Sequence, residues 1–393
     1  MIAWIQTKAL LVEAYRELNA KKLFWLALGI NAIVIAVYAS LGIDDGGVTF
    51  WHWRFPESEQ ISGLISAETF YKAQFVAWGI PFLNWASTIL ALISTAAIIP
   101  DMITGGAIET MLSKPIGRVR LLLTKFATGL LFVTLQVGVF SLGCFLVIGI
   151  RGQAFEPQLF LAIPIVVIFY SYLFSVCVLL GLLTRSTIAS LMLTGLFWFM
   201  LVVMNATDAI LVSQREGTEA RVERLERQVE TQLEIAEERL AQMEEQGQPL
   251  TTPEGKEITG ETQRQDAVNP ALRMTRDRLE KAEASEDTWQ RWAALVRGVK
   301  TPLPKTNETI SLLQRWLITQ EELARAMGAD VGVEHDSDED VPENAPAMAD
   351  PEAQQRAQEA FSDRSVGWIV GTSLGFEAVI LAIASIVFAR RDF

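Results

Sequence analysis

Long apolar runs constrain this sequence more than any other feature. Half of its 393 residues are hydrophobic, and they come in blocks rather than scattered along the chain. A helix needs about 20 apolar residues to cross the hydrocarbon core of a bilayer. Blocks of about this length lie at residues 23–43, 73–99, 121–150, 159–183, 187–212 and 366–389. The sequence therefore predicts an all-α polytopic membrane protein with six transmembrane helices.

The charge of the chain is concentrated between the fifth and sixth predicted spans. Residues 213–365 hold 33 Asp and Glu against 19 Lys and Arg, a net charge of −14, while the whole chain carries −13. The rest of the chain is therefore close to neutral. We interpret residues 213–365 as an acidic helical domain inserted between two membrane spans.

Apolar residues of this insert recur at helical spacing. Seven of them step by three or four residues and predict a coiled-coil seam: Val222, Leu225, Val229, Leu233, Ala236, Leu240 and Met243. Because no strong breaker separates the fifth span from this seam, we expect one long helix leaving the membrane. A second helix is predicted over about 271–299 and can pair with the first as an antiparallel hairpin. Its packing side comprises Leu272, Leu279, Ala282, Trp289, Trp292 and Val296.

The end of the insert changes character. A third helix is predicted from Glu308 to Met327. The following stretch, about 328–352, is acidic, contains Pro and is poor in aromatic residues, so we expect a disordered tether. The last span and its tail then occupy residues 366–393.

The positions of Lys and Arg near the span ends predict the orientation. If the N-terminus is cytoplasmic, the inner segments hold Lys8, Arg16, Lys21, Lys22, Lys114, Arg118, Arg120, Lys125, Arg185, Arg390 and Arg391. The short outer loops then hold only Arg54, Lys72 and Arg151. We therefore expect a multi-pass protein of the plasma (cell inner) membrane, with both termini cytoplasmic and the insert outside. Residues 1–22 are expected to form an amphipathic helix on the cytoplasmic membrane surface.

Charges and helix breakers gather in the segment 100–126, between the second and third spans. Pro100 tends to end or kink the preceding helix. The glycine pair at 105–106 allows a sharp turn, and residues 107–113 have the spacing of a short amphipathic helix. The Lys-Pro step at 114–115 ends that helix. We predict a short helix lying across the cytoplasmic ends of two spans.

This segment resembles the loop between the second and third spans of ABC-2-type ATP-binding-cassette permeases. In that family the short helix couples the membrane subunit to its ATPase. Carried over to this sequence, ATPase coupling is assigned to Asp101, Gly106, Glu109, Leu112, Lys114, Pro115, Arg118 and Lys125. An alternative for Glu109 and Arg118 is that they are interfacial charges that only hold the loop at the membrane surface.

The resemblance also implies partners. It implies a separate ABC ATPase subunit, pairing of the permease as a homodimer or as a heterodimer with a second permease, and contact with membrane lipids. The sequence itself contains no phosphate-binding GxxxxGK[ST] motif, so we expect no directly bound cofactor and no catalytic site, with ATP used by the partner subunit. Its two histidines, His52 and His335, lie far apart, which disfavours a histidine-built metal site. We expect no nucleic-acid partner.

The last span carries two further features. Gly367, Gly371 and Gly375 fall within a GxSxG string, but that hydrolase motif needs a strand–turn–helix context and a nearby His. Their four-residue spacing is therefore interpreted as a face for close helix packing. Glu377 lies well inside the span, where an ionisable group is costly. It is either a functional group or a carboxyl that is kept neutral or hydrogen-bonded to Ser, Thr or Gln on a neighbouring helix, such as Gln136.

Taken together, the sequence predicts the membrane-spanning permease subunit of an ABC-type exporter. The competing class is a non-transporting membrane scaffold or sensor. In that case the outer coiled coil binds an extracytoplasmic partner.

Overall fold

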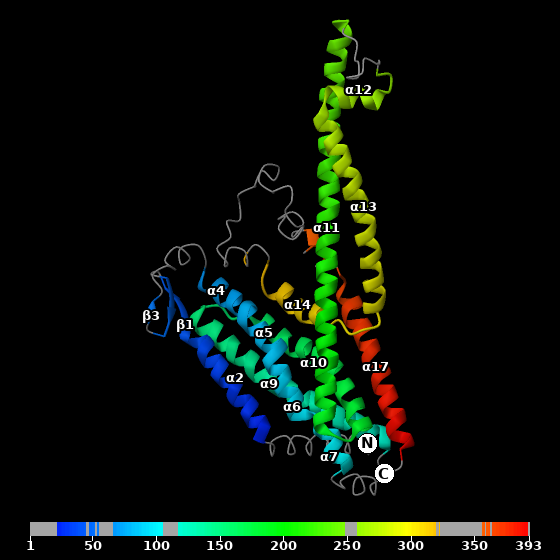
Figure 1. Ribbon diagram of the computed structural model, residues 1–393. Helices are drawn as coiled ribbons and strands as arrows, with labels where there is room; N and C mark the ends of the chain where they lie inside the picture. The colour runs from blue at the N-terminus through cyan, green and yellow to red at the C-terminus, as the bar shows by residue number, and fades with distance from the viewer. Residues whose placement is uncertain are drawn as a thin grey trace. The chain divides into compact units, whose positions relative to one another are not determined.

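The computed structural model in Figure 1 is mostly helical and describes most of the chain. The described residues are 22–44, 47–51, 53–54, 66–104, 117–247, 258–319, 322, 356–357, 359–361 and 364–391. The predicted N-terminal helix, apart from Lys22, and the predicted tether at 328–352 lie outside these residues.

The chain divides into two compact units, and one division falls inside a helix. The first unit comprises Met1–Val203, Lys300–Val333 and Ser365–Phe393, and the second comprises Met204–Val299 and Glu334–Arg364. The insert therefore does not belong to one unit throughout, because Lys300–Val333 belongs to the unit that contains most of the apolar helices.

The first unit consists of helices and one small sheet. In chain order its elements are α2 (Lys22–Ser40), β1 (Leu41–Asp44), β2 (Gly47–Phe50), β3 (Trp53–Arg54), α4 (Ala67–Gln74), the π-helical turn η2 (Phe75–Gly79), α5 (Ile80–Phe82), the π-helical turn η3 (Leu83–Ser87), α6 (Thr88–Thr95), α7 (Ile98–Thr104), α9 (Arg118–Arg151), the 3₁₀ turn η4 (Pro157–Leu161), α10 (Ala162–Thr184), the first part of α11 (Thr187–Glu245), α14 (Thr306–Leu317) and α17 (Val366–Arg390). The second unit holds the rest of α11, α12 (Glu261–Val268) and α13 (Pro270–Lys300) up to Val299.

Six helical stretches in the described part of the chain are long and apolar enough to cross a membrane. They are Lys22–Ser40, Ala67–Ile103, Arg118–Arg151, Pro157–Thr184, Thr187–Glu245 and Val366–Arg390. By helix length and composition, the predicted number of six spans is confirmed. The second stretch begins at Ala67 rather than near residue 73, because Ser66 caps it by accepting a hydrogen bond from the Thr69 amide at 3.1 Å.

The prediction of an all-α fold is wrong for residues 41–44, 47–50 and 53–54. The three short strands form an antiparallel sheet in the order β1-β2-β3, with Leu41 opposite Phe50 and Thr49 opposite Arg54. The sequence signal was present, because Val48, Thr49 and Phe50 are β-branched or aromatic residues directly after a glycine.

Helix α10 forms the centre of the first unit. It packs against α9, α17, α14, η4 and α7, and Figure 1 shows it among these helices. Phe169, Tyr170 and Leu173 on α10 are fully buried. The ring of Phe174 stacks between Phe126 of α9 and Tyr170, with centroid distances of 5.4 Å to each. This aromatic stack fixes how closely α9 and α10 approach.

A chain of polar side chains connects α2, α9 and η3 inside the apolar core. The Asn31 side-chain amide donates to the backbone carbonyl of Gln136 at 3.0 Å. The Gln136 side-chain amide in turn donates to the hydroxyl of Ser87 at 3.0 Å. Gln136 is therefore committed to these helices, and the proposed pairing of Gln136 with Glu377 is wrong.

The insert contains the expected long helix and a second helix beside it. α11 runs without interruption from Thr187 to Glu245. Val222 and Leu225 of α11 form a hydrophobic cluster with Leu279 and Ala282 of α13, and Figure 1 shows the two helices side by side there. Further along α11, the Asn269 side-chain amide donates to the side-chain oxygen of Gln232 at 2.7 Å. The coiled coil over the whole seam stays a prediction.

Two predictions about the insert are wrong. Trp292, which was placed on the packing side of the second helix, is 55% exposed. The third helix, α14, ends at Leu317 instead of Met327, since the next residue, Ile318, has an extended backbone with φ −144° and ψ 138°.

The aromatic stack generates a test of the packing of α9 on α10. A Cβ atom on Gly129 would lie 2.2 Å from the Phe174 ring, whereas on Gly138 of the same helix its nearest neighbour would be 3.9 Å away. We predict that Gly129→Ala lowers stability by about 1–3 kcal/mol, because overpacking forces buried side chains out of place. The matched variant Gly138→Ala should be neutral or more stable by up to about 1 kcal/mol, because Ala favours the helix over Gly. Apparent melting temperatures in detergent measure both, and equal melting temperatures would contradict the packing described.

Candidate functional site

The two ends of the first unit hold different groups of polar contacts. We call the end that contains Arg118, Leu182 and Arg391 the loop end, because the segment 105–116 joins α7 to α9 there. We call the end that contains α14 the α14 end. Predicted site residues occur at both.

Pro100 leads towards the segment 105–116 without ending a helix. The break comes earlier, at a turn formed by Ala96 and Ala97, and α7 then begins at Ile98 and continues through Pro100. Proline is tolerated in the first turn of a helix, because the amide there has no partner within the helix. On α10, a Cβ atom at Gly181 would lie 3.3 Å from the Pro100 ring, so the glycine allows close contact between α7 and α10. Asp101 is exposed.

Arg118 begins α9 and binds the end of α17. Its guanidinium donates to the backbone carbonyl of Arg391 at 2.8 Å and to that of Ala389 at 3.2 Å. The last carbonyls of a helix have no partner within the helix, and a cation is favourable at this negative end of the helix dipole. Arg118 thus satisfies the end of α17 from the first turn of α9.

Arg391 extends this link to α10. Its guanidinium donates to the backbone carbonyl of Leu182, near the end of that helix. The ends of α17 and α10 and the start of α9 are therefore connected by two arginines. Of the predicted coupling residues, Arg118 belongs to this connection, and Lys125 lies about two turns further along α9, partly buried.

The remaining predicted coupling residues lie outside the described part of the chain. They are Gly106, Glu109, Leu112, Lys114 and Pro115. Their role in ATPase coupling stays a prediction.

At the α14 end, Glu377 lies against α10. Its carboxylate accepts a hydrogen bond from the hydroxyl of Ser171 at 2.5 Å, and the residue is 9% exposed. A serine on a neighbouring helix was one of the expected partners, and the structure identifies it as Ser171. The contact is compatible with both interpretations of Glu377, functional and structural.

The glycine face of α17 points away from the rest of the first unit. Gly367, Gly371 and Gly375 are exposed, and a Cβ atom on any of them would meet nothing within 4 Å. Close helix packing at these glycines within the chain is not seen among the described residues. Packing against another molecule stays a prediction.

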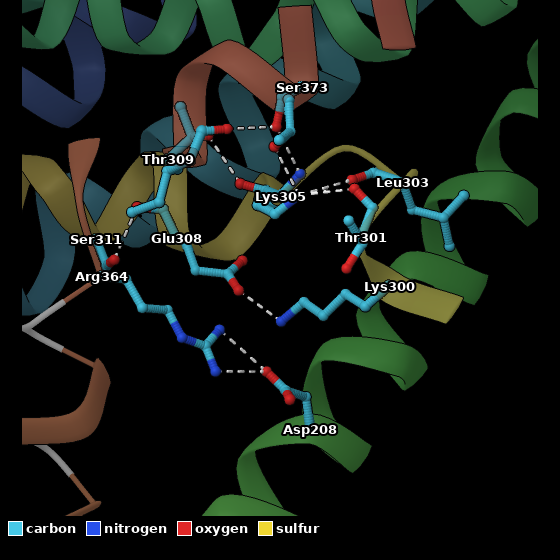
Figure 2. Close-up of polar contacts among 12 residues, drawn as sticks. Asp208, Lys300, Thr301, Leu303, Lys305, Glu308, Thr309, Ser311, Arg364 and Ser373 are labelled. Carbon is cyan, nitrogen blue, oxygen red and sulfur yellow. Dashed lines mark hydrogen bonds and ion pairs between the residues drawn. The ribbon is translucent and has the colours of Figure 1, made fainter. Parts of the chain in front are cut away.

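Sequence reasoning missed a group of buried charges at the start of α14. Figure 2 shows Lys305 beside Ser373 of α17. Lys305 is fully buried, and its ammonium group donates to the hydroxyl of Thr372 at 2.7 Å and to the carbonyl of Thr301 at 3.0 Å. It also lies 4.2 Å from the centre of the Trp368 ring, a cation–π contact. The Lys305 amide donates to the hydroxyl of Ser373 at 2.9 Å.

An ion pair joins α13 to α14 in the same region. The ammonium group of Lys300 lies 2.5 Å from the carboxylate of Glu308, and both side chains are about nine-tenths buried (Figure 2). The apolar face of α14, with Ile310, Leu313 and Leu317, belongs to the main hydrophobic core. Charges in an acidic insert are usually solvated, so the charges themselves gave no sign of burial. Only the helical spacing of the apolar residues between Lys305 and Ile318 could have indicated that this segment is buried.

The described residues contain no group of three or more His, Cys, Asp or Glu side chains that could hold a metal ion. The polar groups at both ends of the first unit instead connect helices, by binding helix-end carbonyls at one end and by joining α14 to α17 at the other.

Comparison with known families supplies a further finding. The family described as ABC-2 family transporter protein matches residues 11–237. No curated protein and no solved structure matches the chain. The matched range includes the first four candidate spans and most of α11.

The buried ion pair yields a stability prediction. Lys300→Met leaves the Glu308 carboxylate buried without the ammonium group 2.5 Å away, and removing one partner of a buried pair costs about 3–5 kcal/mol. The double replacement Lys300→Met with Glu308→Leu should recover most of this loss, because no buried charge remains. Melting temperatures of the single and double variants in detergent measure the coupling.

The exposed pair of Arg264 and Glu244 provides the control. These side chains are 35% and 63% exposed and lie 2.6 Å apart. Arg264→Met should cost less than about 1 kcal/mol, because water screens the pair. If Lys300→Met costs no more than Arg264→Met, the Lys300–Glu308 pair does not hold α14 in place.

Proposed function

Because the chain belongs to the ABC-2 family of transporter proteins, we propose that it is the membrane-spanning permease subunit of an ATP-driven exporter. The family match covers more than half of the chain, and the six candidate spans fit a multi-pass membrane protein. The match gives no support to the alternative of a non-transporting scaffold or sensor.

ATP hydrolysis is assigned in this proposal to a separate ATPase subunit. The sequence contains no GxxxxGK[ST] motif that would hold the phosphates of ATP. The permease is proposed to work as a pair, either with a second copy or with a second permease. Both termini would face the cytoplasm and the insert the other side of the plasma membrane, as the distribution of Lys and Arg favours.

The observation that carries the proposal is how the segment 105–116 is anchored on both sides. On one side Pro100 packs against Gly181 of α10, and on the other Arg118 binds the last carbonyls of α17. A displacement of this segment by an ATPase would therefore act on α10 and α17 together. These two helices also carry Ser171 and Glu377, which are hydrogen-bonded to each other.

Coupling needs two arrangements of the spans that bind the partner differently. A nucleotide-bound ATPase can shift the permease between them only by as much as it prefers one of the two. We propose that the helix predicted at 107–113 is the element that the ATPase contacts, with Glu109 as the charge that binds it.

Loss of the ATPase tests this proposal. The double variant Glu109→Ala with Arg118→Ala should lose the ATPase that co-purifies with the unaltered chain from native membranes in mild detergent. The control Arg151→Ala removes an arginine from the other end of α9, where it donates to the carbonyl of Ala39 at 2.6 Å, and should retain the ATPase. A preparation of the unaltered chain that never contains an ATPase would overturn the proposal.

A separate test asks whether the movement is passed on within the permease after the ATPase has bound. Arg391→Met removes the bond to the Leu182 carbonyl, so the ATPase should remain bound while transport-linked ATP hydrolysis falls severalfold. The adjacent Arg390 is exposed, and Arg390→Met should leave hydrolysis unchanged. Equal hydrolysis in the two variants would show that the Arg391 contact has no part in coupling.

A further inference from the structure

The last turns of α13 expose a group of large apolar side chains. Trp292, Leu295 and Val299 are 55%, 59% and 51% exposed. Their spacing of three and four residues places them on one face of the helix. We call these three residues the α13 apolar stripe.

The stripe is not the face by which α13 packs in its own unit. Leu272, Ala282 and Ala293 are buried on another side of the helix, and Leu279 packs against Val222 and Leu225 of α11 there. Contiguous exposed apolar side chains mark contact surfaces, and the large ring of Trp292 contributes the largest part of the apolar area here.

The apolar character is confined to the end of the helix. Further back along the same face lie Lys281 and Thr288, which are exposed and polar. A helix that paired with another helix over its whole length would continue the apolar stripe, so the occupant of this surface contacts only the last turns of α13.

The charge of this end is opposite to that of the insert around it. Residues 289–300 contain Arg291, Arg297 and Lys300 and no Asp or Glu, whereas residues 213–365 carry a net charge of −14. Arg291 is exposed and adjoins the stripe, whereas Arg297, also exposed, lies on the opposite side of the helix. Tryptophan next to arginine on a helix face is typical of segments that lie in the interface between lipid headgroups and acyl chains.

Chain continuity places this end near a bilayer. The residue after Val299 is Lys300, which the first unit holds through Glu308 at 2.5 Å. Five residues later, Lys305 contacts Trp368 in the first turn of the apolar helix α17. Trp292 precedes Lys300 by eight residues, about 12 Å of helix. The headgroup layer on each side of a bilayer is about 5–8 Å thick.

We propose that the α13 apolar stripe binds the surface of the phospholipid bilayer at the membrane face where α17 begins. Trp292, Leu295 and Val299 lie at the boundary between headgroups and acyl chains, and Arg291 contacts the phosphates of anionic lipids. The inference does not depend on transport or on an ATPase.

Lipid-borne quenchers test the proposal on the full-length chain. In a background of Cys144→Ala and Cys177→Ala, a fluorophore on Leu295→Cys reports the stripe. The matched position is Ala294→Cys, which is exposed on the same turn but on a different face. The protein is reconstituted into vesicles of equal parts phosphatidylcholine and phosphatidylglycerol that contain lipids with a nitroxide near the headgroup.

We expect severalfold stronger quenching at position 295 than at position 294. Equal quenching at the two positions overturns the proposal. It is also overturned if the label at 295 is shielded from both the nitroxide lipids and a water-soluble quencher, which would indicate a protein partner or a second copy of the chain.

The contribution of Arg291 has its own test. Arg291→Gln should reduce quenching at position 295 in the mixed vesicles to the level found in vesicles of phosphatidylcholine alone. If quenching at position 295 with Arg291 intact is the same in both kinds of vesicle, Arg291 does not bind anionic headgroups.

Discussion

Inside a bilayer a polar side chain finds no water, so its hydrogen bonds must come from neighbouring helices. The apolar faces of these helices are alike and permit many packings, whereas each polar pair fits few. Asn31 and Gln136 fix α2 and η3 on α9, Ser171 and Glu377 fix α17 on α10, and Lys305 fixes the start of α14 on α17. The arrangement of the first unit depends on these few contacts.

The two ends of that unit are connected through the same pair of helices. At the loop end Arg118 and Arg391 link α9, α17 and α10, and at the other end α14 lies against α10 and α17. A rigid shift of α10 against α17 would therefore change both ends together. This connection is what the proposed exporter needs, because ATP would act at one end while the spans rearrange along their length.

The residue pattern alone was enough to predict some structural elements but not others. The spans could be predicted because a long apolar block has few other stable states, and the uninterrupted α11 because nothing in its sequence breaks a helix. The sheet at 41–54 was missed because its strands have only two to four residues. Trp292 was placed on the wrong face because helical spacing groups neighbouring residues but does not say which side meets the partner helix.

The sequence by itself determined that the chain crosses a membrane, that an acidic helical insert precedes the last span, and that the ATP-binding motif is lacking, since each follows from composition or from a contiguous pattern. Only the tertiary structure decided that Lys305 and the Lys300–Glu308 pair are buried, that Glu377 bonds to Ser171, and that Arg118 binds the end of α17. These contacts join residues far apart in the chain or depend on which face of a helix is covered. No local pattern specifies such partners.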